Sequence, residues 1–217
     1  TSYVPTTSAA VYLPRRNHHV WNTATSLWDI TGYRHESAAA TNLAVDSNSF
    51  ATAQWVATGT PTITAGQANS LTGQSDATLL AASSAVDTKI VDTIGVTGST
   101  AYTHSVYAKA NASNWLLVFS TDITNSGAWF NLSTGALGTV QAAATARIEA
   151  VGGGWYRCST TATSGAIATT GFTIELASGD GASTAAATDS ILIYGAQFET
   201  GSIPTSYIPT AGATVTR

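Results

Sequence analysis

The chain has 217 residues, a net charge of −4 and only 20 charged side chains, 8 of them Lys or Arg and 12 Asp or Glu. Hydrophobic residues make up 44% of it, a balance that excludes intrinsic disorder, and so few cations exclude a nucleic-acid partner, because binding to phosphate needs clustered positive charge. Its apolar runs are interrupted by Ser, Thr and Gly well before the roughly 20 residues that a membrane helix needs, so we expect no membrane insertion.

The first and the last segments of the chain are nearly the same. Residues 1–11 read TSYVPTTSAAV, and residues 205–215 read TSYIPTAGATV. Such a repeat is typical of a tandem array. We therefore interpret residues 1–11 as the tail of a preceding unit, although two similar edge strands of one sandwich would explain the repeat as well. With the stretches HHVWN and LWDI, which can form a small hairpin, residues 1–34 are predicted to be an N-terminal appendage to one module, residues 35–217.

Further along the chain, hydrophobic residues recur with a period of two, and β-branched and aromatic residues dominate the runs. Gly, Asn, Ser and Asp separate these runs, and no amphipathic helix with caps at both ends is evident. The predicted strands are 54–57, 60–64, 77–81, 89–96, 101–110, 115–121, 128–132, 139–142, 147–151, 155–163, 171–176 and 190–200. Many short strands at this spacing predict an all-β fold, a two-sheet antiparallel β-sandwich wound as a jelly roll or Greek key.

Strand alternation then sorts the side chains into core-facing and outward-facing sets. The set assigned to the core comprises Tyr102, His104, Val106, Ala108, Ala110, Tyr156, Cys158, Phe172, Ile174 and Leu176. The set assigned to the outside comprises Tyr107, Lys109, Trp155, Arg157, Thr173 and Glu175. Cys158 is the only cysteine, so the chain has no internal disulfide and must be stabilised by packing.

Several phrases together resemble the repeated modules of bacteriophage tail and virion-surface proteins. These phrases are HESAAATNL (35–43), YTHSVYAKA (102–110), AWFNLSTG (128–135), GWYRC (154–158) and YGAQFETGSIPTSYIP (194–209). The β-sandwich of those modules is similar to carbohydrate-binding modules. The resemblance covers residues 14–217 and implies an extracellular or virion-surface, non-catalytic jelly roll that binds a polysaccharide or cell-surface glycan. It also implies a homotrimer as one form of assembly.

A glycan-binding surface combines exposed aromatic planes with a few fixed hydrogen-bonding side chains. The predicted contacts are Tyr107, Lys109, Trp115, Trp129, Trp155, Arg157 and Glu175. Trp155 and Arg157 can equally form a packing contact, with the guanidinium stacked on the indole. Trp115 begins the run WLLVF, which is apolar on both faces and can be wholly buried, while Trp129 lies beside a turn.

Motifs for catalysis or metal binding are scarce. No GxSxG motif, no supported Cys/His arrangement and no distinguished pair of carboxylates is present, so we expect a protein that is not an enzyme and requires no cofactor. Jelly-roll carbohydrate modules often carry a structural Ca²⁺, and the resemblance therefore implies Asp180 and Asp189 as ligands beside the loop before the last long strand. Both are also ordinary turn residues.

Non-catalytic polysaccharide binding is the predicted function. The alternative is a structural spacer or oligomerisation module of a virion fibre, whose outward aromatic residues are buried against neighbouring copies. A third hypothesis, a depolymerase, requires a catalytic Glu.

Overall fold

The computed structural model describes the backbone of residues 15–22, 27–34 and 39–217, and the side chains from residue 39 onward. Within these ranges it contains strands but no helix, and so no helix that is long and apolar enough to cross a membrane. Residues 1–11, which we predicted to be the tail of a preceding unit, lie outside the described residues.

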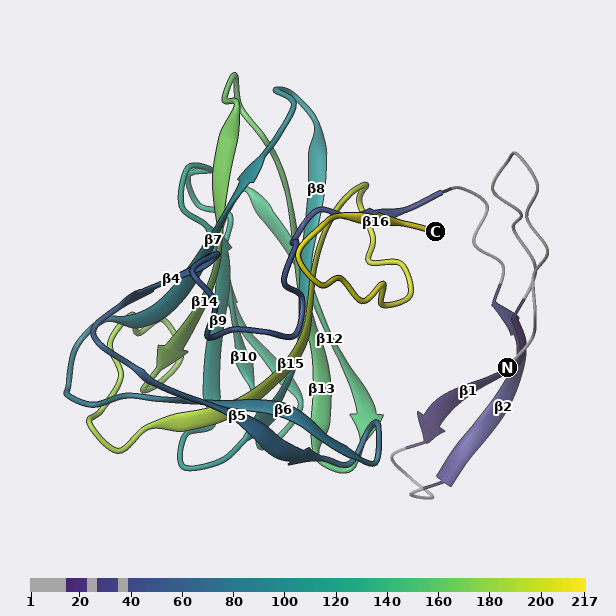
Figure 1. The fold of residues 1–217 in the computed structure, drawn as a ribbon, viewed down its shortest axis with the longest axis horizontal. Helices are drawn as coiled ribbons and strands as arrows, with labels where there is room; N and C mark the ends of the chain where they lie inside the picture. The colour runs from purple at the N-terminus through teal and green to yellow at the C-terminus, as the bar shows by residue number, and fades with distance from the viewer. Residues whose placement is uncertain (1–14, 23–26, 35–38) are drawn as a thin grey trace.

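Sixteen strands are described (Figure 1). They are β1 (Arg15–Asn22), β2 (Leu27–Arg34), β3 (Thr41–Asn42), β4 (Trp55–Thr58), β5 (Thr62–Asn69), β6 (Gln74–Ala81), β7 (Thr88–Gly95), β8 (Ala101–Ala110), β9 (Trp115–Ser120), β10 (Ala128–Asn131), β11 (Ala136–Val140), β12 (Ala144–Gly152), β13 (Trp155–Thr163), β14 (Thr169–Ala177), β15 (Ser190–Thr200) and β16 (Val215–Thr216). Each of the twelve predicted strands corresponds to one of β4–β15, while the two-residue strands β3 and β16 were not predicted. The predicted hairpin is confirmed, because β1 pairs with β2 in antiparallel register, with Trp21 opposite Trp28.

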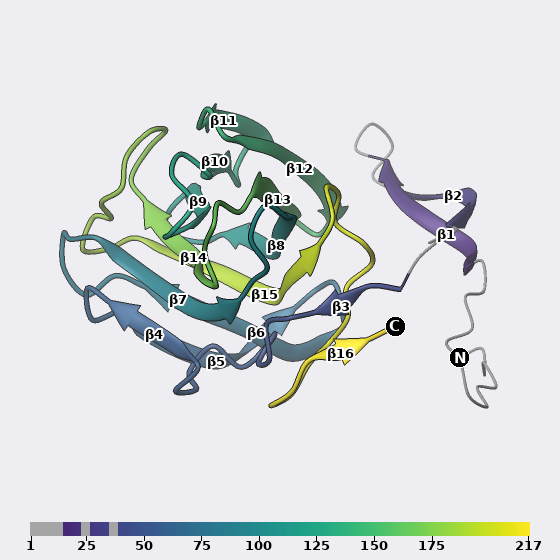
Figure 2. The same ribbon diagram turned by 90° about the horizontal axis from the view of Figure 1, so that it is seen from above.

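Two six-stranded antiparallel sheets form a sandwich, as the sequence predicted (Figure 2). The β14 sheet has the order β11-β10-β9-β14-β7-β4, and the β8 sheet has the order β12-β13-β8-β15-β6-β5. Late strands lie between early ones, since β14 is inserted between β9 and β7 and β15 between β8 and β6. Such non-consecutive neighbours are typical of Greek-key and jelly-roll windings.

The hydrophobic core lies between the two sheets and is rich in aromatic side chains. Phe172 of β14 and Phe198 of β15 are fully buried with ring centroids 6.1 Å apart, and Tyr102 stacks on Phe198 at 5.2 Å. His104 completes this group, in contact with Phe198 at 4.8 Å and with hydrogen bonds to Ser120 and Thr160. Burial lowers the pKa of His104 to about 4, so the ring is neutral at pH 7. The core assignments of Tyr102 and His104 are therefore confirmed.

A β-bulge in β15 changes which residues face the core. Ile191 and Ile193 point inward, but the pairing with β8 shifts between Tyr194 and Gln197, and Phe198 points inward in turn. One extra residue in a strand reverses the alternation beyond it. Gln197 therefore points to the outer face of the β8 sheet, although it is 0% exposed.

Candidate functional site

The seven predicted glycan contacts lie on two opposite outer faces of the sandwich and so cannot form one binding surface. On the β8 sheet, cross-strand pairing joins Tyr107 to Arg157 and Lys109 to Trp155. The β14 sheet carries Trp115, Trp129 and Glu175, and there Leu117 is the cross-strand partner of both Trp129 and Glu175. The outward direction assigned to Glu175 is confirmed, since its strand neighbours Ile174 and Leu176 belong to the core.

Trp155 and Arg157 point away from the core, but they are not exposed, and the prediction that they form a solvent-facing platform is wrong. Trp155 is 1% exposed and Arg157 is 6% exposed. The Arg157 guanidinium donates a hydrogen bond from Nη2 to Ser105 Oγ over 2.9 Å, and its Cζ lies 5.4 Å from the centre of the Tyr107 ring. The Arg157 guanidinium thus packs against the Tyr107 ring, an arrangement that suits a long cation beside an aromatic ring.

The turn at Gly153 lies beside Trp155 and close to Ser70 of a neighbouring hairpin. Ser70, in the turn between β5 and β6, lies so close to Gly153 that a Cβ on this glycine would be 2.3 Å from the Ser70 Oγ. The same Cβ would be 3.8 Å from Cδ1 of Trp155. Strand alternation predicts the direction of a side chain but not what a distant hairpin places over it.

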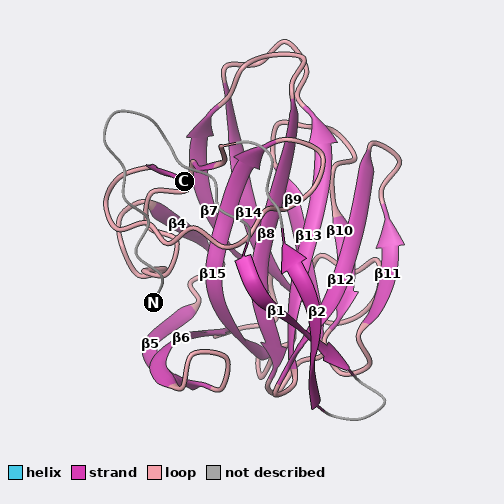
Figure 3. Ribbon diagram, turned by 90° about the vertical axis from the view of Figure 1, so that its right-hand side faces the viewer, coloured by secondary structure: helices cyan, strands magenta, loops and turns pink. Residues whose placement is uncertain are grey.

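Three half-buried tyrosines form a cluster on the outer face of the β8 sheet, which Figure 3 shows with β15, β8 and β13 side by side. The tyrosine cluster consists of Tyr107 from β8, Tyr194 from β15 and Tyr207 from the C-terminal segment. Ring centroids are 6.0 Å apart for Tyr107 and Tyr194, 6.1 Å for Tyr107 and Tyr207, and 5.5 Å for Tyr194 and Tyr207. Their phenol groups sit beside partly exposed ring faces, so the cluster offers both apolar planes and hydrogen-bonding groups.

Gly195 makes this close approach of rings feasible. It adopts a φ of +61° in the bulge of β15, a conformation that L-residues rarely adopt. A Cβ at this position would lie 3.0 Å from the Tyr107 ring and 3.2 Å from the Tyr207 ring. The absence of a side chain at Gly195 therefore lets the rings of Tyr107 and Tyr207 approach the bulge closely.

Polar groups surround the tyrosine cluster. The Tyr207 hydroxyl is 2.7 Å from Ser47 Oγ, and burial raises the pKa of Tyr207. Burial and the nearby carboxylate of Asp76 raise the pKa of Tyr194. Lys109, half-buried at the end of β8, donates from Nζ to the Gly153 carbonyl over 2.8 Å. Tyr194 and Tyr207 are therefore neutral at physiological pH.

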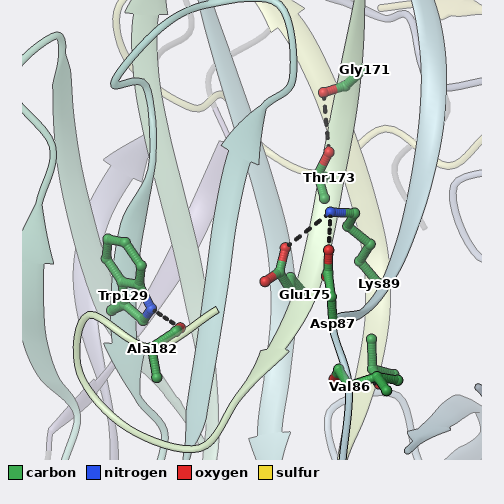
Figure 4. Close-up of polar contacts among 9 residues, drawn as sticks. Val86, Asp87, Lys89, Trp129, Gly171, Thr173, Glu175 and Ala182 are labelled. Atoms are coloured by element: carbon green, nitrogen blue, oxygen red, sulfur yellow. Dashed lines mark hydrogen bonds and ion pairs between the residues drawn. The ribbon is translucent and has the colours of Figure 1, made fainter. Parts of the chain in front are cut away.

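On the opposite face, a long loop covers Trp129. The Trp129 indole is 6% exposed and its Nε1 donates to the Ala182 carbonyl over 2.6 Å (Figure 4). It packs with Leu117 and Ala177 in a small cluster separate from the main core. The expectation of an exposed Trp129 plane is wrong for this reason, whereas Trp115 beside the cluster remains half-buried.

Glu175 is buried next to Lys89, with one carboxylate oxygen lacking a partner. The side chain of Glu175 is 2% exposed, its Oε2 lies 3.7 Å from Lys89 Nζ, and its Oε1 has no hydrogen-bond partner among the described residues. Lys89 is closer to Asp87, at 2.7 Å, as Figure 4 shows. Burial raises the pKa of Glu175 to about 7, and repulsion from Asp87 adds to this effect, while Lys89 opposes it. Glu175 is thus turned outward but is not accessible as a direct sugar contact.

The two predicted calcium ligands each accept hydrogen bonds that close loops. Asp180 accepts hydrogen bonds from the backbone N and the Oγ1 of Thr139, at 2.7 and 3.2 Å, which ties its loop to β11. Asp189 accepts one from the Ala186 N at 2.7 Å, within its own turn. In residues 39–217 no three His, Cys, Asp or Glu side chains are grouped as a metal site. Both aspartates thus act here as loop-closing residues, and calcium binding stays an untested prediction.

Tyr194 and Tyr207 are members of the cluster that the sequence analysis did not identify as contacts. Their phrases were recognised, but as marks of a repeat, and Tyr194 precedes a bulge that alternation cannot anticipate. The signal that would have found them is the pairing of Tyr194 with Tyr107 across β15 and β8, which requires the strand order.

Comparisons with known proteins give only distant likenesses. No family model matches the chain, and no curated protein matches it. One similar solved structure is the Clostridium thermocellum endo-1,4-beta-D-xylanase 10B, its CBM22-1-GH10 modules complexed with xylohexaose, with 14% identity and a TM-score of 0.44 over 79% of this chain and 29% of that one. Another is the enzymatically active domain of Bacteriophage CBA120 tailspike protein 4, with 14% identity and a TM-score of 0.47 over 74% of this chain and 21% of that one. The chain thus spans less than a third of the length of either protein.

Proposed function

We propose that the outer face of the β8 sheet binds a glycan through the tyrosine cluster of Tyr107, Tyr194 and Tyr207. The observation that carries this proposal is the meeting of three half-buried tyrosines from three segments, with ring centroids within 6.1 Å of one another. A sugar ring has an apolar C–H face and a rim of hydroxyl groups, and tyrosines match both features.

The support beneath the tyrosine cluster favours binding without rearrangement. Arg157 is fixed under Tyr107 by its bond to Ser105, and Tyr207 is held by Ser47. A surface whose side chains are already held loses little conformational freedom when a ligand binds. Lys109 at the edge of this surface adds a hydrogen-bond donor for a hydroxyl or carboxylate of the ligand.

The outer face of the β14 sheet fits this function less well. Its Trp129 is covered by the loop that contains Ala182, and its Glu175 is buried beside Lys89. Of the predicted contacts there, Trp115 alone keeps a partly exposed ring. A sugar could stack on Trp115, where the exposed carboxylate beside the ring, that of Asp180, already accepts hydrogen bonds from Thr139.

The biological setting follows from the sequence resemblance. We propose a non-catalytic module of a phage-like, multi-domain tail or surface protein, placed on a virion or outside the cell, whose partner is a polysaccharide or cell-surface glycan. The alternative is a spacer module that assembles, as a homotrimer for example, by burying these tyrosines against neighbouring copies. In that case the protein should form a stable oligomer in solution, which sedimentation velocity would detect.

Binding can be tested by affinity electrophoresis of the full chain in gels that contain plant, algal or bacterial polysaccharides. With a polysaccharide that retards the unsubstituted protein, Tyr107→Ala and Tyr194→Ala should each weaken affinity about tenfold, the equivalent of about 1.4 kcal/mol for one lost stacking contact. Trp115→Ala is the matched control on the opposite face and should be retarded like the parent, and thermal melting would confirm that all three variants are folded.

Other outcomes would contradict this assignment. Loss of retardation in Trp115→Ala alone would move the site to the β14 sheet. A folded parent protein that no polysaccharide retards at millimolar site concentration would leave the spacer function as the better explanation.

A further inference from the structure

The C-terminal segment, residues 205–210 with the sequence TSYIPT, is bound to the sandwich by a dedicated set of buried polar side chains. At its start, Thr205 donates hydrogen bonds to the Glu199 carboxylate from its backbone N at 2.8 Å and from its Oγ1 at 2.6 Å. Gln197 accepts from the Ile208 N at 2.7 Å and donates to Glu199 at 2.6 Å. β15 therefore recognises both the backbone and the first side chain of the segment.

β3 and the segment that follows it hold the other half. Asn42 donates from Nδ2 to the Ile208 carbonyl over 2.9 Å. Ser47 Oγ is 2.7 Å from the Tyr207 hydroxyl and accepts from the Thr210 N at 2.8 Å, while the Ser47 N donates to Thr210 Oγ1 at 3.0 Å. This interlocking leaves few polar groups of the segment unpaired.

The receptor side of this contact is completely buried. Its four residues, each 0% exposed, are Asn42, Ser47, Gln197 and Glu199, and we call them the segment site. Burying polar groups, a carboxylate above all, is costly unless each finds a partner, and here the partners come largely from the segment. Such a site is specific for a ligand that presents the right donors and acceptors in the right order.

The N-terminal segment, residues 1–6 with the sequence TSYVPT, carries the same donors and acceptors. In the alignment of the two sequences, the residues that correspond to Thr205, Tyr207 and Thr210, whose side chains form hydrogen bonds, are Thr1, Tyr3 and Thr6. The single difference is at Ile208, where the N-terminal segment has Val4, a side chain that is smaller by one methylene. The sequences differ more beyond these six residues. Gly212 adopts a φ of +79°, which favours glycine, whereas the corresponding residue of the N-terminal segment is Ser8.

From this equivalence we propose that residues 1–6 of one chain are a second ligand for the segment site and dock there on another copy of the module. The contact would link consecutive modules by the recognition of the TSY(V/I)PT sequence. In a single chain the site is filled by its own C-terminal segment, whose covalent attachment gives it a large effective concentration. Docking in trans is therefore expected to show itself only when that segment is weakened.

The first experiment asks whether the N-terminal sequence fits the segment site. Three substitutions in the full chain, Ile208→Val, Ala211→Thr and Thr214→Ala, give residues 205–215 the N-terminal sequence except at Gly212, which is kept for its backbone conformation. The thermal midpoint should stay within about 4 °C of the parent value, since about 1 kcal/mol is at stake. As the control, Tyr207→Ala with Ile208→Ala should lower it by more than about 8 °C.

The second experiment tests docking in trans. The receptor is the full chain with Tyr3→Ala, Tyr207→Ala and Ile208→Ala, which weakens both of its own segments, and the probe is a synthetic peptide of residues 1–11. The peptide should raise the thermal midpoint of this receptor in a concentration-dependent way. It should not affect the parent chain, and a peptide with Tyr3→Ala and Thr6→Ala should have no effect on the receptor.

Two results would overturn the proposal. A three-substitution chain that melts as low as the Tyr207→Ala/Ile208→Ala control would show that the N-terminal sequence does not fit the segment site. A receptor that responds to a peptide of residues 205–215 but not to that of residues 1–11, or to neither, would show that the N-terminal segment is not a ligand in trans. Neither result depends on glycan binding, which is measured separately.

Discussion

Replacing Trp155 by alanine should lower the free energy of unfolding by about 3 to 5 kcal/mol, because the substitution leaves a large cavity where the buried indole was. Trp155 is 1% exposed and is the largest of the fully buried side chains in residues 39–217. For a domain of this size the thermal midpoint should fall by about 10 °C. Thermal or urea unfolding, followed by circular dichroism, measures the effect.

Trp155→Phe is the matched control. The Trp155 Nε1 is buried with no hydrogen-bond partner among the described residues, so phenylalanine removes an unsatisfied donor while it keeps much of the apolar volume. This variant should cost only about 1 kcal/mol. If Trp155→Ala instead melted like the parent and lost glycan retention, Trp155 would be an exposed contact and the cover over β13 would be wrong.

Glu175 should make the protein less stable as the pH rises from about 4.5 to about 7. Its pKa is about 7 in the folded protein, against 4.5 as the ordinary value of a glutamate in an unfolded chain, so between these values the folded protein keeps a proton that the unfolded chain releases. Stability is therefore lost as this carboxyl ionises. Glu175→Gln removes the ionisation. The free energy of unfolding of this variant, relative to that of the parent, should therefore rise by about 3 kcal/mol between pH 4.5 and pH 7.

The comparison between variant and parent isolates Glu175 from other groups. Burial lowers the pKa of His104 from 6.5 to about 4, so the contribution of His104 to the free energy of unfolding is lost as the pH falls from 6.5 to 4. This pH dependence is opposite in sign to that of Glu175. The contribution of His104 is common to both proteins and cancels in their difference. Urea unfolding at pH 4.5, 6 and 8 would measure this difference. Glu149→Gln, at a side chain that is 38% exposed, is the control and should track the parent. A difference for Glu175→Gln that does not change with pH would instead mean that folding leaves the pKa of Glu175 unchanged.

Local sequence was sufficient for the strands and for the direction of many side chains. A period of two, interrupted by glycine and small polar residues, predicted β4–β15, and it placed Phe172, Ile174 and Leu176 in the core and Glu175 on the other face. This success has a simple cause, because successive side chains in a strand must alternate and one face must be apolar to form a core.

Alternation failed where contacts between distant segments decide the outcome. Trp155 faces outward as predicted, yet it is buried near a hairpin turn, and Trp129, a predicted contact whose direction was left open, is covered by the loop containing Ala182. The bulge at Gly195 moves Gln197 and Glu199 to the outer face, where they hold the C-terminal segment. No local pattern encodes such cover, since it depends on which segments meet in space.

By itself, the sequence determined the fold class, the strands and the recurrence of the TSY(V/I)PT phrase at both ends of the chain. The tertiary structure alone decided that seven predicted contacts divide between two faces, that Tyr194 and Tyr207 join Tyr107, and that the C-terminal phrase is held by four fully buried polar residues. The physical reason is that propensity and alternation act between neighbours along the chain. Exposure and hydrogen-bond partnership are instead set by strand order and by the loops that cross each sheet.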